Sequence, residues 1–168
     1  PSKIILGIDP GTATTGWGVI KVVKNTPNYI ASGTISTDKK HTDEERLHTI
    51  YKDLGALLTT YKPEALALEN LFFNTNAKTA LTVGQARGVI MLVAVTSEIP
   101  IYSYTPLQVK MAMTGYGRAD KKQIQEMVKN ILKLPQVPRP DDAADALAVA
   151  LTHAFTLKIR INAREITV

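Results

Sequence analysis

Lys3-Ile4-Ile5-Leu6-Gly7-Ile8 is a short apolar run that ends at Asp9-Pro10-Gly11. A run of this length that stops at a turn signal predicts a buried β-strand with Asp9 at its end. Two β-rich segments follow, at about 16–23 and 29–37, with Asn25-Thr26-Pro27-Asn28 between them. Together the three segments predict an antiparallel meander.

Beyond the meander, helical and strand patterns alternate along the chain. The predicted elements are a helix over 43–61 that Pro63 stops, a strand over 65–68, a helix over 76–98, a strand over 101–104, a helix that opens near Asp120 with Gln123 at capping-box spacing, and a last helix from Asp141-Asp142. The apolar half of the second helix, 89–95, predicts burial on most of its sides. This order predicts an α/β domain with a five-stranded mixed sheet flanked by helices. We expect one domain over 1–158 and a tail over 159–168.

Composition excludes several classes of protein. The 168 residues are 45% hydrophobic and include no cysteine, so a compact core is expected and disulfides, zinc–thiolate sites and thiol nucleophiles are not. No run approaches the ~20 uninterrupted apolar residues of a membrane span, and the start lacks the layout of a secretory signal. A cytoplasmic protein without a membrane partner is therefore expected. The net charge of +5 fits a nucleic-acid partner, or simply a basic surface.

Four acidic residues occupy positions where acids are hard to explain structurally. Asp9 and Glu69 each end a predicted strand, while Asp142 and Asp145 share one face of the last helix. Four carboxylates repel one another unless a cation lies among them, and Mg²⁺ prefers such oxygen ligands. Two such ions can support phosphodiester cleavage. Alternatively, Asp9 is a turn residue and Asp141 or Asp142 a helix cap, but Glu69 and Asp145 resist that interpretation.

Four segments carry a family resemblance: Ile8 to Thr12, Leu68 to Phe72, Leu81 to Gly88 with its Gly84-Gln85-Ala86-Arg87-Gly88 core, and Asp142 to Ala148. In order and spacing they resemble the RuvC family, over about residues 3–155. The resemblance implies an RNase H-like fold, with Asp9, Glu69, Asp142 and Asp145 as metal-binding catalytic carboxylates. It also implies a Holliday junction resolvase acting in homologous recombination and DNA repair. Such an enzyme is a homodimer that nicks two opposing strands of a four-way DNA junction. It leaves ligatable 5′-phosphate and 3′-hydroxyl ends, and its partner is the RuvA–RuvB branch-migration complex. We expect two Mg²⁺ ions per site, with Mn²⁺ able to substitute.

Two adjacent aromatic residues, Phe72 and Phe73, follow Glu69 and enter a polar segment. Position alone favours packing in the core, whereas an exposed ring could stack on an unpaired base. The resemblance favours Phe72 as the residue that stacks at the crossover. Both phenylalanines are therefore predicted to contact DNA.

Basic residues gather around Gly115-Tyr116-Gly117, on a predicted loop before a helix. They form either a solvated basic face or a phosphate-binding surface helped by the helix N-terminus. Lys110 and Lys121 match lysines that the family needs for cleavage, so the resemblance implies catalytic roles for them. Arg118 and Lys122 are predicted DNA contacts.

Arg87, on the second helix, either reaches DNA or pairs with an acid, and is included among the DNA contacts. Gly84, Ala86 and Gly88 would let another helix approach closely, within the monomer or across the dimer interface that the resemblance implies. The histidines His41, His48 and His153 look incidental.

Three other functions fit parts of the sequence. Asp9-Pro10-Gly11-Thr12 with Thr15-Gly16 resembles the nucleotide-binding turn of actin-like and sugar-kinase folds, but the chain holds only one such half. A general RNase H-like nuclease acting on RNA is a second alternative. A non-catalytic junction-binding module is a third, although idle acids would repel DNA phosphates.

Overall fold

The computed structural model describes residues 2–70 and 76–165, with side chains through Ile159. Within these residues the elements are β1 (Ser2–Asp9), β2 (Thr14–Val23), β3 (Thr26–Ser36), α1 (Asp43–Tyr61), β4 (Ala65–Glu69), α2 (Ala77–Thr96), β5 (Ile101–Tyr104), α3 (Pro106–Thr114), α4 (Lys121–Ile131) and α5 (Asp141–Glu165). The predicted α/β class is confirmed.

The five strands form one mixed sheet in the order β3-β2-β1-β4-β5. β1, β2 and β3 pair antiparallel, whereas β4 and β5 join them in parallel with β1. Lys24 and Asn25, with φ of 48° and 64°, make the tight turn between β2 and β3, a backbone that suits a two-residue hairpin. The predicted meander and mixed sheet are therefore both present.

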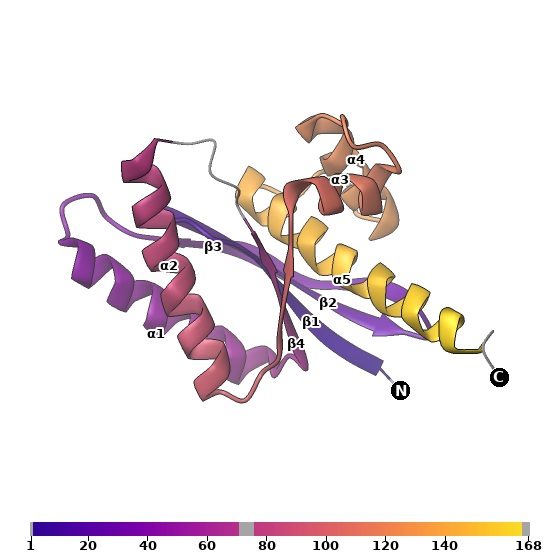
Figure 1. Cartoon of the computed structure of the whole chain (residues 1–168), viewed down its shortest axis with the longest axis horizontal. Helices are drawn as coiled ribbons and strands as arrows, with labels where there is room; N and C mark the ends of the chain where they lie inside the picture. Colours follow the sequence, from indigo (N-terminus) through magenta and orange to yellow (C-terminus); the bar gives the residue numbers. More distant parts are fainter. Residues whose placement is uncertain (1, 71–75, 166–168) are drawn as a thin grey trace.

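Helices cover both faces of the sheet. α1 and α2 lie against one face, and α5 with α3 and α4 lies against the other (Figure 1). Side chains of β1 alternate between the two cores, because successive residues of a strand point to opposite faces. Leu6 and Ile8 pack toward α1 and α2, while Ile5 packs toward α5. By the same alternation Asp9 faces α5.

Glycines on the inner strands let α5 lie very close to the sheet. A Cβ atom built on Gly7 of β1 would lie 2.1 Å from the carbonyl oxygen of Ala146, and one built on Gly16 of β2 would lie 2.0 Å from that of Asp142. No side chain fits in that space. Gly16 is the direct cross-strand partner of Asp9, so this contact brings the start of α5 beside the end of β1.

α2 is buried on one face only, and the expectation that 89–95 would be buried on most sides is wrong for the single chain. Ala86, Ile90, Val93 and Ala94 lie in the core. The exposed apolar residues are Leu81 (64% exposed), Met91 (41%), Leu92 (56%) and Val95 (65%). By length and composition alone α2 could also cross a membrane. The search of the sequence for ~20 uninterrupted apolar residues did not indicate this. The buried face of α2 instead packs with α1 and the sheet.

α3 was not predicted from the sequence, and it moves Lys110 from an expected loop onto a helix. Thr105 and Gln108 form a capping box, and Pro106 occupies the first turn, which is a start signal for a helix. The helix ends after nine residues at Gly115, whose φ is 71°. At the other end of the molecule, α5 continues to Glu165, into the segment expected to be a tail.

His153 is a core residue that joins α5 to β5. The residue is 2% exposed, and its Nδ1 lies 2.6 Å from the hydroxyl of Tyr104. Its ring packs on the ring of Tyr102 with centroids 4.2 Å apart. A histidine treated as incidental in the sequence is thus part of the packing that holds α5 on the sheet.

Candidate active site

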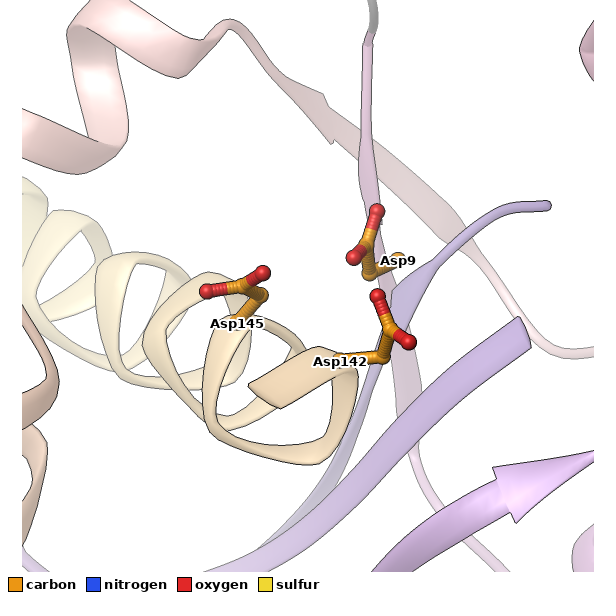
Figure 2. Close-up of side chains that lie close together, drawn as sticks. All are labelled: Asp9, Asp142 and Asp145. Carbon is orange, nitrogen blue, oxygen red and sulfur yellow. The ribbon is translucent and has the colours of Figure 1, made fainter. Parts of the chain in front are cut away.

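Three aspartates from two elements meet at one end of the sheet. Asp9 comes from the end of β1, and Asp142 and Asp145 come from the first two turns of α5 (Figure 2). One carboxylate oxygen from each residue lies within 4.8 Å of those of the other two. The three side chains are partly buried, so their charges are poorly screened by water. The spacing of three residues on α5 brings Asp142, rather than Asp141, beside Asp145.

Glu69 joins this group through Asp9. It ends β4, the parallel neighbour of β1, and the two carboxyl groups share a hydrogen bond. Burial, followed by the charge of Glu69, raises the pKa of Asp9 to about 9. Burial also raises the pKa of Glu69. Without a cation, burial and the neighbouring acids therefore favour a proton on the Asp9–Glu69 pair.

Lys121, at the start of α4, forms an ion pair with Asp145. Its Nζ lies 3.0 Å from Oδ2 of Asp145 and 3.9 Å from Oδ2 of Asp141. Burial opposes its charge, but the bond to Asp145 and the nearby aspartates raise the pKa of Lys121. Burial nevertheless keeps the pKa of Asp145 above its usual value. Asp141 also pairs with Arg139.

A cleft of about 240 Å³ opens beside these groups. Glu69, Asp145, Lys110 and Lys121 all line it, from four different elements. With Asp120, the N-cap of α4, three acids and two lysines therefore line one space at the ends of β4 and the first turns of α5. Such a space offers carboxylate oxygens to a cation and ammonium groups to an anion.

The donor set suits a hard divalent cation. Every ligand atom that Asp9, Glu69, Asp142 and Asp145 can offer is a carboxylate oxygen, the type that Mg²⁺ and Mn²⁺ prefer. The raised pKa values of Asp9, Glu69 and Asp145 mean that the bare cluster resists full ionisation, which a bound cation would relieve. These residues therefore fit a divalent metal.

The other predicted contact residues lie in different surroundings. Arg118 and Lys122 are exposed, on the loop before α4 and in its first turn. Arg87 is partly buried and donates hydrogen bonds to the main-chain oxygen of Glu69 and the hydroxyl of Ser103. Phe72 and Phe73 lie outside the described residues.

Two contributions to the site were not predicted from the sequence. Gly16 was expected to start a strand and was considered as part of an alternative nucleotide-binding turn, whereas in the structure it makes room for the backbone of Asp142. Arg87 was expected either to reach DNA or to pair with an acid, and in the structure it binds the main-chain oxygen of Glu69. The signal available for Gly16 was a glycine inside a strand pattern, which often marks close approach of another backbone. No sequence signal identifies a main-chain acceptor.

A mixed five-stranded sheet with acids at the ends of its central strands and on the crossing helix defines a nuclease of the RNase H-like fold. The family model of the crossover junction endodeoxyribonuclease RuvC matches residues 5–153. The chain belongs to that family of endonucleases.

Curated relatives and solved structures agree with this assignment. The chain is 52% identical to the crossover junction endodeoxyribonuclease RuvC of Rubrobacter xylanophilus over 154 residues, covering 92% of this chain and 86% of that protein. It is 55% identical to that of Alkaliphilus oremlandii over 153 residues, covering 91% and 93%. Thermus thermophilus RuvC in complex with Holliday junction substrate is 36% identical, with a TM-score of 0.89 over 94% of this chain and 96% of that one.

Proposed function

We propose that this chain resolves Holliday junctions by metal-dependent endonucleolytic cleavage, making paired symmetric nicks during homologous recombination and DNA repair. The observation that carries the proposal is the group of three aspartates from β1 and α5, which Glu69 joins through Asp9. Two members of this group, Glu69 and Asp145, line a cleft together with two lysines. Membership of the RuvC family supports the substrate, because a relative has been solved with a Holliday junction.

Asp9, Glu69, Asp142 and Asp145 would hold Mg²⁺, two ions per site, with Mn²⁺ able to substitute. Bound there, the metal would supply Lewis-acid stabilisation and a lowered pKa of the attacking water. Glu69 and Asp145 face the cleft, so they are suited to orient a water against a phosphate. With the 3′ oxygen as leaving group, the products would be 5′-phosphate and 3′-hydroxyl ends.

Lys121 and Lys110 are proposed to act at the scissile phosphate. Both line the cleft that contains Glu69 and Asp145. An ammonium group beside the phosphate stabilises charge that develops in the transition state. For Lys121 this requires its Nζ to leave Asp145, which lies 3.0 Å away, and to turn toward the phosphate.

Further contacts with the junction are proposed for basic and aromatic residues outside the carboxylate group. Arg118 and Lys122 are exposed and can contact phosphates, which supply most of the affinity for DNA. Phe72, with Phe73 beside it, would stack on an unpaired base at the crossover. Partnership with the RuvA–RuvB complex in the cytoplasm completes the proposal.

A homodimer is proposed through the exposed face of α2. Leu81, Leu92 and Val95 are each more than half exposed, and Gly84 and Gly88 on the same helix have open space where a Cβ would lie. Apolar and small residues at this spacing form a stripe against which a second helix can pack closely. Ala86 is buried within the chain, so it belongs to the monomer core rather than to this interface.

The test uses a cruciform plasmid. One nick relaxes it, and linear product forms only if a second nick follows before dissociation, as a twofold dimer on the junction would produce. Linear DNA that ligase seals directly is the expected product, with Mg²⁺ required. Asp145→Asn should abolish cleavage while junction binding persists, whereas Asp141→Asn should still cleave the junction. Leu92→Glu, designed to separate the subunits, should yield nicked circles instead.

Three outcomes would redirect or contradict the proposal. Equal cutting of linear duplex or of RNA–DNA hybrid would indicate a general RNase H-like nuclease. Binding without cleavage in either Mg²⁺ or Mn²⁺ would indicate a junction-binding module. Mostly nicked circles from the wild-type protein would contradict paired cleavage even if the metal site is correct.

A further inference from the structure

Arg87 connects α2 to the ends of the neighbouring parallel strands β4 and β5. Its Nη1 donates a hydrogen bond of 2.9 Å to the main-chain oxygen of Glu69, the last residue of β4. Its Nη2 donates one of 3.0 Å to Oγ of Ser103 in β5. Both branches of the guanidinium are therefore engaged inside the protein. Burial lowers the pKa of Arg87, but an arginine remains charged throughout the physiological range.

The Glu69 oxygen that Arg87 binds lies where the sheet ends. The pairs of β4 with β1 run through Leu68, and on the other side Glu69 pairs with Tyr104, the last residue of β5. One residue later, the amide of Asn70 donates to the oxygen of Tyr104. A main-chain oxygen at such a position needs a partner, and a charged donor makes a stronger bond than a neutral one.

Fixing this peptide group also fixes the direction of the Glu69 side chain. The carboxyl group must lie against Asp9 and at the cleft it shares with Asp145. A small rotation of the Glu69 backbone would move it away from both. Groups that orient metal ligands in this way typically change metal affinity or activity about 10–100-fold when they are removed.

We infer that Arg87 is a positioning residue, which holds Glu69 in the active site through its main chain and makes no contact with DNA phosphate. This inference rests on the proposed role of Glu69 as a metal ligand. It differs from the expectation of a DNA contact, because one N–H group on each branch of the guanidinium already binds Glu69 or Ser103. Lysine cannot take this place fully, since one ammonium group does not reproduce the two-branched geometry.

The experiment compares Arg87→Met and Arg87→Lys with the wild type and with Lys122→Met, an exposed cation proposed to touch phosphate. Two quantities other than activity are measured. The first is Mn²⁺ affinity of the protein alone, by electron paramagnetic resonance. The second is the salt dependence of junction binding without divalent metal. We expect Arg87→Met to weaken Mn²⁺ binding about 10–100-fold with an unchanged salt slope, and Lys122→Met to lower the slope by about one without affecting Mn²⁺.

Arg87→Lys keeps the experiment decisive if Arg87→Met does not fold, as judged by thermal unfolding. Positioning predicts weakened Mn²⁺ binding in Arg87→Lys, whereas a phosphate contact would survive as a point charge and leave Mn²⁺ binding normal. Normal Mn²⁺ affinity in both variants, or a shallower salt slope in Arg87→Met, would overturn the inference. Glu69→Gln separates this failure from a failure of the proposed function. If Glu69→Gln also binds Mn²⁺ normally, Glu69 is not a ligand. If only the Arg87 variants do so, Arg87 alone was misassigned.

Discussion

Replacing Gly16 by alanine should damage the active site without altering any carboxylate. The added Cβ would lie 2.0 Å from the main-chain oxygen of Asp142 and 2.5 Å from its carbonyl carbon. Real Cβ atoms essentially never come closer than 3.0 Å to such atoms. Because backbone rather than a flexible side chain opposes the methyl group, the start of α5 must retreat by about 1 Å.

That displacement is large for a metal site and modest for the fold. Ligand distances in metal sites hold to about ±0.2 Å, so moving Asp142 away from Asp9 by about 1 Å should weaken divalent-metal binding severely. A misplacement of this size costs on the order of 100-fold in rate. Overpacking costs about 1–3 kcal/mol of stability, and ~2 kcal/mol corresponds to roughly 4–8 °C in Tm for a chain of this size.

The assay measures junction cleavage, Mn²⁺ affinity and Tm on Gly16→Ala and on Gly55→Ala as a matched control. A Cβ on Gly55, in α1, meets nothing within 4 Å, and alanine favours a helix over glycine by about 1 kcal/mol. The control should therefore gain stability and cleave normally. Wild-type cleavage and Mn²⁺ binding by Gly16→Ala would refute the claim that this close approach sets the position of Asp142.

Three further predictions concern single side chains. The pKa of Asp9 is raised from 3.8 to about 9, so between these pH values the folded protein keeps a proton that the unfolded chain releases. The metal-free protein should therefore lose stability as the pH rises from about 4 to about 9. In urea unfolding measured across this range, Asp9→Asn should flatten the dependence of stability on pH. Lys121→Ala and Lys110→Ala should lower kcat by more than they weaken junction binding, and equal losses in single-turnover rate and in affinity would place both lysines on a general basic surface. Phe72→Ala should cut slowly yet bind with similar affinity, because stacking worth roughly 1–3 kcal/mol per base would be used to distort the junction; unchanged cleavage with a lowered Tm would identify Phe72 as a packing residue.

Much of the fold could be predicted because its signals are local. The apolar run before Asp9 and the helical spacing over 43–61 each depend on neighbouring residues, and both elements formed as expected. α3 was not predicted because its nine residues contain too few apolar repeats to show a helical period, although the residues of its capping box are present in the sequence. The two faces of α2 could not be separated, since apolar residues on all sides do not indicate which side meets the sheet.

The carboxylates of the candidate site were predictable for a different reason. Acids at strand ends and on one helix face are unusual in themselves, so Asp9, Glu69 and Asp145 stood out in the sequence. The structure brings them together. What holds them in place was not predictable, because the bond from Arg87 ends on a main-chain oxygen and the contact at Gly16 involves main chain of Asp142. Neither contact depends on the type of side chain it meets.

The packing of α5 on β1 and β2 also has a consequence for how the protein is made. β1 emerges from the ribosome long before α5. Until α5 docks, the glycine-lined face of the sheet has no helix packed against it in the nascent chain. Contacts between segments so distant in sequence form late and slowly. Asp142 and Asp145 arrive with the same helix that closes this core. A nascent or truncated chain without α5 therefore lacks both a complete core and a complete set of acids, so nuclease activity begins only when folding is finished.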